Sequence, residues 1–280
     1  MLKVSNGLLD ASVIHRPVPT RPNTTAPDAY KAPRAANAPV DRRAVPATPR
    51  RVHPELDTTV QPRDISSARE MEQIVRDMLP CFNGKEDETN WQKREKNIIM
   101  LRRITHGNAP HEFSQAYLAG IKTLLDPIFK VANSLRTTMQ TNGLEMLQSL
   151  ARVNGSRLDP MIDIILNNAM KLCGNSKKIT AHNGNLTVGA LLENVTCNTR
   201  VLAHVTSAAA SSNNNLRFFS AGWLRIVING QGKHKTTPEG LASIAQCIKN
   251  GISDARPENR ESYRLTFWEF HKAWPSKAQQ

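Results

Sequence analysis

Apolar side chains recur every three or four positions from residue 66 to the end of the chain, which is the spacing of one α-helix face. The first such stripe consists of Met71, Ile74, Val75, Met78 and Leu79. Others lie within residues 113–128, 161–172 and 241–248. Residues 224–228 alone favour a strand locally, but the helical stripes around them favour a helix that continues from Leu216. The pattern therefore predicts an all-α structure.

Glycine, asparagine and proline residues divide this region into five pairs of helices. The predicted pairs are 66–83 with 91–105, 110–131 with 135–153, 158–173 with 178–195, 198–211 with 215–229, and 239–250 with 257–273. Each pair takes about 40 residues, which is the length of a HEAT-type repeat. Such repeats stack into an α-solenoid with two layers of helices, and the short turns inside the pairs line up along one edge. We therefore expect an α-solenoid of HEAT-like helix pairs.

The first 64 residues have a different composition, with 10 of the 17 prolines and one of the 14 aromatic residues. Such a segment buries too little apolar surface to offset the entropy cost of ordering it, which predicts a disordered Pro/Arg-rich linker. The predicted organisation is a linker over 1–64, a helical-repeat domain over 65–276 and a tail over 277–280. Within the linker, Thr48 precedes a proline and two arginines, which fits a proline-directed phosphorylation site. Chance in a Thr/Pro/Arg-rich segment is the alternative.

Several classes of function find no support in the sequence. No apolar run approaches the ~20 residues of a membrane helix, and the first ten residues lack the apolar stretch of a secretory signal, which favours cytosol or nucleus. The four cysteines are far apart and form no C-x-x-C pair, so we expect buried free thiols rather than a zinc site. Motifs of nucleotide-binding loops, serine hydrolases and zinc proteases do not occur. We expect neither catalysis nor a cofactor, metal or small-molecule substrate.

Basic residues recur at the predicted turns. The chain carries a net charge of +13, of which +9 belongs to residues 65–280. One series of bases, at positions 94, 136, 178, 217 and 256, has steps of 42, 42, 39 and 39 residues, close to the repeat length. Acidic residues are rare in the middle turns, since residues 127–158 contain only one, Glu145. The candidate binding residues are Trp91, Lys93, Arg94, Arg136, Lys177, Lys178, Arg217, Arg256 and Arg260.

Trp91 begins a predicted helix directly after the polar residues 88–90. A tryptophan at this place either packs into the core as a hydrophobic staple or lies exposed as an anchor for a partner, because Trp and Arg dominate interface hot spots. The sequence alone leaves both interpretations open.

A long basic edge suits a large acidic partner, either a nucleic acid bound through its phosphates or an acidic protein surface. Nucleic-acid modules usually add aromatic stacking platforms, and the other aromatic residues here lie at core spacing. A protein partner is therefore preferred to a nucleic acid. A third hypothesis is a scaffold that binds a peptide on the concave face of the helices.

Three segments resemble a known family. Residues 90–96 (NWQKREK) look like the opening turn of a TOG domain, and residues 134–138 (SLRTT) look like the second-repeat turn of its CLASP branch. Residues 254–275, which begin with DARPENRE and end in WP, are similar to the last helix pair of CLASP TOG domains. The resemblance covers about residues 66–275 and is strongest to the second TOG domain of a fungal CLASP.

The resemblance implies a function. CLASP proteins bind tubulin and microtubules, promote rescue and stabilise the spindle, which implies the cytoplasm, cytoskeleton, nucleus and mitotic spindle as locations. TOG domains contact tubulin through the turns inside the repeats. The resemblance therefore implies contacts at five successive turns, made by Trp91 and Arg94, by Arg136, by Lys177 and Lys178, by Arg217, and by Arg256 with Arg260. It also favours an exposed Trp91.

The chain departs from the family pattern in two respects. A TOG domain usually has six repeats, whereas five helix pairs are predicted here. The further TOG domains, the Ser-rich lattice-binding region and the C-terminal domain of a full CLASP are not in this sequence. Isolated modules of this kind bind weakly because avidity comes from linking several of them.

Overall fold

The computed structural model describes residues 60–230 and 236–279. All of them belong to one compact unit, residues 47–280. The predicted linker falls outside the described residues except for its last five positions, and the predicted phosphorylation site at Thr48 lies outside them altogether.

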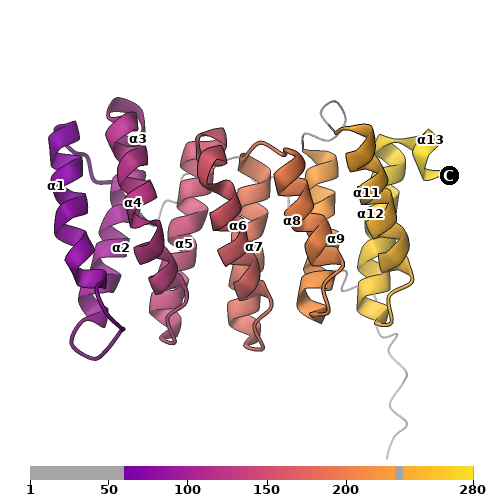
Figure 1. Ribbon diagram of the computed structural model, residues 1–280, viewed down its shortest axis with the longest axis horizontal. Helices are drawn as coiled ribbons and strands as arrows, with labels where there is room; N and C mark the ends of the chain where they lie inside the picture. The colour runs from indigo at the N-terminus through magenta and orange to yellow at the C-terminus, as the bar shows by residue number, and fades with distance from the viewer. Residues whose placement is uncertain (1–59, 231–235, 280) are drawn as a thin grey trace, which may run out of the picture. The chain divides into compact units, whose positions relative to one another are not determined.

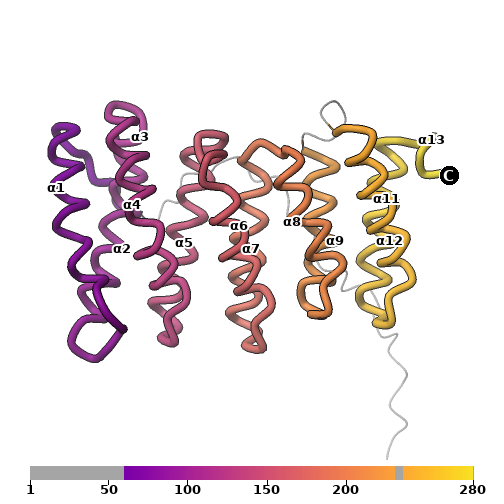
Figure 2. The backbone as a smooth tube through the Cα atoms, viewed as in Figure 1, coloured from indigo at the N-terminus to yellow at the C-terminus, as the bar shows by residue number. Residues whose placement is uncertain are grey.

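The described residues form a solenoid of helix pairs in two layers (Figures 1 and 2), which confirms the predicted fold class. The first layer contains α1 (Ala68–Met78), α4 (Ser114–Ala132), α6 (Ile162–Cys173), α8 (Thr199–Ala209) and α11 (Pro238–Ile252). The second layer contains α2 (Trp91–Thr105), α5 (Thr137–Asn154), α7 (Lys178–Asn194), α9 (Asn214–Asn229) and α12 (Pro257–Ala273). Short helices connect or end these elements: η1 (Leu79–Phe82), α3 (Ala109–Glu112), η2 (Gly155–Met161) and α13 (Pro275–Ala278).

Each predicted pair corresponds to one pair in the structure, with ends that differ by a few residues. Residues 224–228 lie within α9, as the flanking helical stripes predicted. The connecting helices α3 and η2 were not predicted as separate elements. Each contains a proline, Pro110 or Pro160, which removes an N–H donor and interrupts a longer helix.

The core lies between the layers and is built from the predicted stripes. In α1, the hydroxyl of the N-cap residue Ser67 accepts the N–H of Glu70 at 3.1 Å, and this cap starts the helix. Met71 and Met78 then become buried against α4, because they share one helix face. Burial of each such side chain contributes about 1.5–3 kcal/mol relative to exposure. Since one continuous cluster of this kind joins all five pairs, each repeat depends on its neighbours.

Polar side chains of the second layer link neighbouring repeats. The indole Nε1 of Trp223 in α9 donates to Asn185 of α7 at 2.8 Å. On its other side, α9 is joined to α12 by the hydroxyls of Ser220 and Tyr263, which are 2.7 Å apart. Burial raises the pKa of Tyr263 to about 12, so its hydroxyl stays protonated. These pairs fix how each helix is placed against the next.

The segment ahead of α1 packs back onto the first repeat. The N–H of Arg63 donates to the carbonyl of Arg103 at 2.9 Å, and the side chain of Arg103 donates to the carbonyl of Gln61 at 2.8 Å. The amide of Asn108 closes the contact, since it accepts the N–H of Ile65 at 2.9 Å and donates to the carbonyl of the same residue at 3.0 Å. Residues 60–66 are thereby part of the folded array.

Two findings bear on the excluded classes. In the described ranges, no helix is both long and apolar enough to cross a membrane. The four cysteines are free, but only Cys173 is buried, while Cys81, Cys197 and Cys247 are half-buried. The prediction of buried thiols is therefore correct for one of the four.

Candidate functional site

The five turns inside the helix pairs lie side by side along one edge of the array, at the bottom of Figure 1. We call this surface the turn edge. It consists of residues 83–90, 133–136, 174–177, 210–213 and 253–256, together with the first turn of the helix that follows each. All the predicted binding residues therefore lie on one edge, but they do not all face solvent.

Most of the predicted basic residues occupy one of two positions relative to the second-layer helices, while Lys93 and Lys178 lie between these positions. One position is the N-cap residue, which precedes each helix: Asn90, Arg136, Lys177, Asn213 and Arg256. The other position lies four residues later: Arg94, Gln140, Ala181, Arg217 and Arg260. The periodic series seen in the sequence takes residues from both positions, together with Lys178, which directly follows its N-cap residue, and the structure separates the roles of the two positions.

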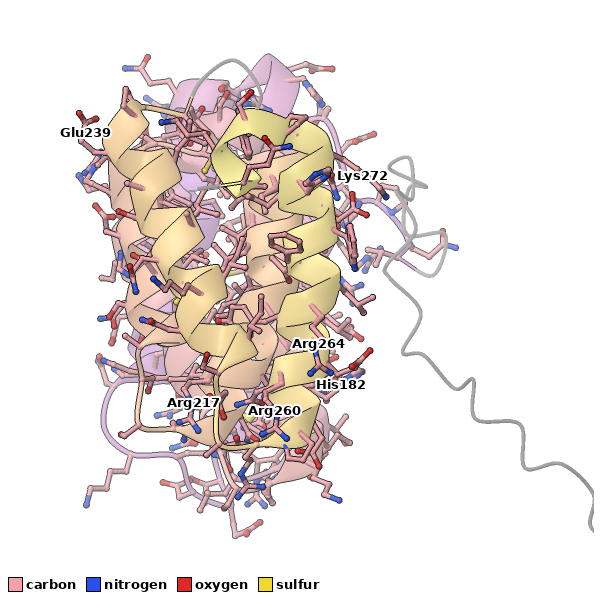
Figure 3. All side chains as sticks on the ribbon, turned by 90° about the vertical axis from the view of Figure 1, so that its right-hand side faces the viewer. His182, Arg217, Glu239, Arg260, Arg264 and Lys272 are labelled. Atoms are coloured by element: carbon pink, nitrogen blue, oxygen red, sulfur yellow. The ribbon has the colours of Figure 1, made fainter. Side chains whose placement is uncertain are left out.

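Arginines at the later position fold back onto the carbonyl groups of their own turn. Arg217 Nη1 donates to the carbonyl oxygens of residues 211 and 212 at 3.0 and 2.9 Å. Arg260 Nη1 donates to those of residues 254 and 255 at 2.8 and 2.9 Å, which are the same offsets along the chain. Figure 3 shows both arginines at the turn end of the array, on α9 and α12. These bonds satisfy backbone acceptors that no helix uses.

Arg94 does the same in the first turn and is almost completely buried, with 2% of its surface exposed. Its Nε donates to the carbonyl of Cys81 at 3.0 Å, and its Nη2 donates to that of Asn83 at 3.0 Å. Its guanidinium also lies 5.9 Å from the ring centroid of Phe82. In this conformation the guanidinium of Arg94 supports the turn from beneath and is not on the surface, so its direct contact with a partner stays a prediction that requires the side chain to move.

Arg217 is also held by contacts within the array. Besides its bonds to the turn, its Nε donates to the carboxylate of Asp254 in the next turn at 2.7 Å, and its side chain is only 22% exposed. The described contacts use its donors on both sides, so it acts as a support between the fourth and fifth turns. Arg260 is half-buried and supports the fifth turn in the same way.

The third turn lacks an arginine of this kind, because Ala181 occupies the position. Its carbonyls are satisfied by the next repeat instead: the amide of Asn213 donates to the carbonyl of Gly174 at 2.9 Å. The amide of Asn215 donates to that of Asn175 at 3.1 Å. The shape of this turn therefore depends on the fourth repeat.

Lys93, Lys177, Lys178 and Arg256 are exposed. Among the described residues, none of the four forms an ion pair with a carboxylate, so their charges remain available to a partner. They belong to the first, third and fifth turns. The side chain of Arg136, in the second turn, is 34% exposed and is held in a different way.

Arg136 lies within a cluster that joins the first two turns. Its guanidinium carbon is 5.0 Å from the ring centroid of Trp91, a cation–π contact. Its Nη2 is 2.6 Å from Glu88 Oε1, and its Nε is 3.5 Å from Glu86 Oε1. Trp91 itself is half-buried and packs against the core, and its role as an anchor for a partner stays a prediction.

Sequence reasoning missed the acidic residues of the first turn, Glu86, Asp87 and Glu88, because it weighed acids only in the middle turns. It also missed two apolar side chains at the turn edge. Leu135 is 89% exposed beside Arg136, and Ile179 is 51% exposed beside Lys178. The sequence contained a signal for both, since each is an apolar residue directly beside a candidate basic residue in a predicted turn.

Comparisons with known proteins identify relatives of the whole described array. The family model described as CLASP N terminal matches residues 71–280. Protein stu1 of Aspergillus oryzae is 45% identical over 268 residues, which are 93% of this chain and 22% of that protein. Protein stu1 of Aspergillus fumigatus is 50% identical over 217 residues, which are 76% of this chain and 16% of that protein. The chain thus spans about a fifth of the length of these relatives.

Among solved structures, computationally designed armadillo repeat proteins for modular peptide recognition are similar over 72% of this chain and 91% of theirs, with a TM-score of 0.42 and 13% identity. That likeness is too distant to carry an argument. The family model, in contrast, covers three quarters of the sequence, from the first helix to the last described one. The chain therefore belongs to the CLASP N-terminal family.

Proposed function

We propose that this chain is a tubulin-binding TOG module, and that it contacts tubulin through the exposed bases of the turn edge. The observation that carries the proposal is the common placement of Lys93, Arg136, Lys177, Lys178 and Arg256 on one edge, on turns that buried hydrogen bonds hold in shape. Family membership supports the same partner. The bases would meet acidic groups of tubulin.

The dimensions of the edge suit a protein partner. Packed helices lie ~8–10 Å apart, so five repeats extend the edge to on the order of 40 Å. Exposed Leu135 and Ile179 add apolar contact area between the bases, which a protein interface uses and a phosphate backbone does not. The half-buried ring of Trp91 is already covered on one side by Arg136, which leaves less of it for stacking on a base.

We further propose that residues 65–276 form the binding unit and that the protein stabilises dynamic microtubules, promotes their rescue and takes part in spindle formation. Its proposed locations are the cytoplasm, the cytoskeleton and the nucleus with its mitotic spindle. The charge of the edge steers association, while linked copies supply the avidity. In this proposal the module binds without catalysis. The assignment to a second TOG domain remains a prediction.

The experiment is a charge reversal at two exposed positions, Lys177→Glu with Lys178→Glu. We expect the variant to lose microtubule co-sedimentation and to bind soluble tubulin at least tenfold more weakly, while its circular dichroism stays unchanged. The matched control is Arg69→Glu with Lys122→Glu, which changes the net charge equally on exposed positions of the first layer. Equal binding by the two variants contradicts the proposal.

A second binding experiment tests the main alternative, which is that the turn edge binds a nucleic acid instead of tubulin. If the edge binds RNA or DNA, the wild-type chain associates with a mixed oligonucleotide pool, and the logarithm of its affinity falls steeply with the logarithm of the salt concentration. Tighter binding to the pool than to tubulin at the same salt concentration overturns the tubulin assignment.

A further inference from the structure

We infer that Glu88 competes with the partner for Arg136. Its carboxylate binds the guanidinium where an acidic group of tubulin would bind, and it thereby lowers the affinity of the turn edge for tubulin. The inference rests on the proposed function and assigns a regulator of the same surface. It follows from the contacts of one guanidinium.

Arg136 is enclosed on three sides. The ring of Trp91 covers one face of the guanidinium at 5.0 Å. The Nε atom is buried and makes no hydrogen bond, although Glu86 Oε1 lies 3.5 Å from it. Of its two terminal nitrogens, Nη2 donates to Glu88 Oε1 at 2.6 Å. Because a guanidinium donates only in fixed directions within its plane, a partner carboxylate that pairs with Nη2 along this direction must displace Glu88.

The three acids of this turn differ in what holds them. Asp87 accepts the N–H groups of Thr89 and Asn90 at 2.8 and 3.0 Å, and the bonds from Thr89 hold its pKa below the usual range. These bonds build the turn, so Asp87 is part of its framework.

Glu86 is likewise held in place. Its side chain is 23% exposed, and its Oε1 accepts the hydroxyl of Ser134 at 2.9 Å in addition to its approach to Arg136. Its carboxylate therefore ties the first turn to the second. A partner could replace it only by breaking this link.

Glu88, in contrast, is 84% exposed, and its described contact is the one with Arg136. An exposed ion pair of this kind is worth little, since solvent screens it and two long side chains must be ordered. Glu88 can therefore rotate into solvent and expose Nη2, while Trp91 keeps the guanidinium in place. The other exposed bases of the edge have no such internal carboxylate among the described residues, so the competition is confined to the first two turns.

The test compares the full chain with Glu88→Gln, which preserves the shape of the side chain and removes its charge. We expect Glu88→Gln to bind soluble tubulin dimers about two- to fivefold more tightly, because the weak internal pair no longer has to be broken. Glu88→Ala should behave alike. In an Arg136→Met background, the change at Glu88 should no longer tighten binding, because the shared donor is gone.

The matched control is Glu72→Gln. Glu72 also forms an exposed ion pair, with Arg76 on α1, so this change alters the net charge by the same amount away from the turn edge. We expect its affinity for tubulin to equal that of the wild type. If Glu72→Gln tightens binding as much as Glu88→Gln does, a general charge effect is responsible and the inference is overturned.

The remaining outcomes are also distinct. If the wild type binds tubulin and both Glu88 variants bind it equally or more weakly, the inference is overturned and the proposed function stands. Absence of tubulin binding by the wild type and by the Glu88 variants overturns the proposed function, and the inference with it.

Discussion

The Nε atom of Arg217 in α9 lies 2.7 Å from the Oδ2 atom of Asp254, a residue of the fifth turn. This ion pair joins two successive repeats at the turn edge. The carboxylate also accepts the backbone N–H of Arg256 at 2.9 Å. Partial burial acts to raise the pKa of Asp254, but the hydrogen bonds from Arg217, Arg256 and Asn259 outweigh it and hold the pKa at about 2.

The lowered pKa of Asp254 predicts how acid destabilises the array. Because the folded-state pKa lies below the ordinary value near 4, the stabilising contribution is complete above about pH 4 and is lost as the pH falls toward 2. Asp254→Asn should lower the free energy of unfolding at pH 7 by about 1–3 kcal/mol, since it removes a charged acceptor. Urea titrations at pH 7 and pH 2 should show that the difference from wild type shrinks in acid. A constant difference would contradict the assigned pair.

The buried position of Arg94 predicts a loss of stability rather than a pure loss of binding. Arg94→Met removes the donors to the carbonyls of Cys81 and Asn83 and should cost roughly 2–3 kcal/mol. Thermal unfolding followed by circular dichroism measures this. Its neighbour Lys93 is exposed, so Lys93→Met serves as the control and should leave the melting temperature nearly unchanged. An Arg94 variant that keeps full stability and loses only tubulin binding would instead support a direct contact between Arg94 and the partner.

Close packing between helices predicts opposite effects for two glycine substitutions. A Cβ atom on Gly251 would lie 2.2 Å from the ring of Tyr263, so Gly251→Ala should destabilise the array by about 1–3 kcal/mol or more. A Cβ atom on Gly189 would approach no atom more closely than 3.7 Å. Gly189→Ala should therefore stabilise α7 by about 0.5–1 kcal/mol. Chemical denaturation of the two variants checks both signs.

The two bonds between Asn108 and Ile65 are expected to protect the segment ahead of α1 from amide hydrogen exchange. Its amide both accepts from and donates to the backbone of Ile65, and Asn108→Asp would retain the acceptor but lose the donor. We expect faster amide hydrogen exchange at Ile65 and at Arg63, with little change in the repeats beyond α5. Unchanged exchange at both amides would show that this segment is held by other contacts.

The helix pairs were predictable because each buries one stripe of apolar residues, and the period of the stripe is a property of the sequence. The connecting helices α3 and η2 were harder to predict, since Pro110 and Pro160 end one pattern and begin another within a few residues. Exposure of a half-apolar residue such as Trp91 depends on what packs above it, and that neighbour, Arg136, is 45 positions away along the chain.

For the series of basic residues, the sequence predicted the edge on which they lie but not which of them are exposed. True N-cap residues are separated by 46, 41, 36 and 43 positions, which is less regular than the series read from the sequence. Variation in repeat length hides an offset of four residues, which is about one helical turn. Arg94 and Arg217 therefore fitted the period although their guanidinium groups turn inward. Spacing identified the edge, but only the structure separates a support such as Arg94 from an exposed base such as Lys177.

The support of the third turn by Asn213 and Asn215 has a consequence for the order in which the surface is completed. During synthesis from the N-terminus, the first turn has its own Arg94 as soon as α2 forms. The carbonyls of Gly174 and Asn175 must wait until residues 213–215 have been made and have docked. Lys177 and Lys178 thus acquire their final presentation only when the repeat after them is in place, so the middle of the edge matures later than its position in the chain suggests.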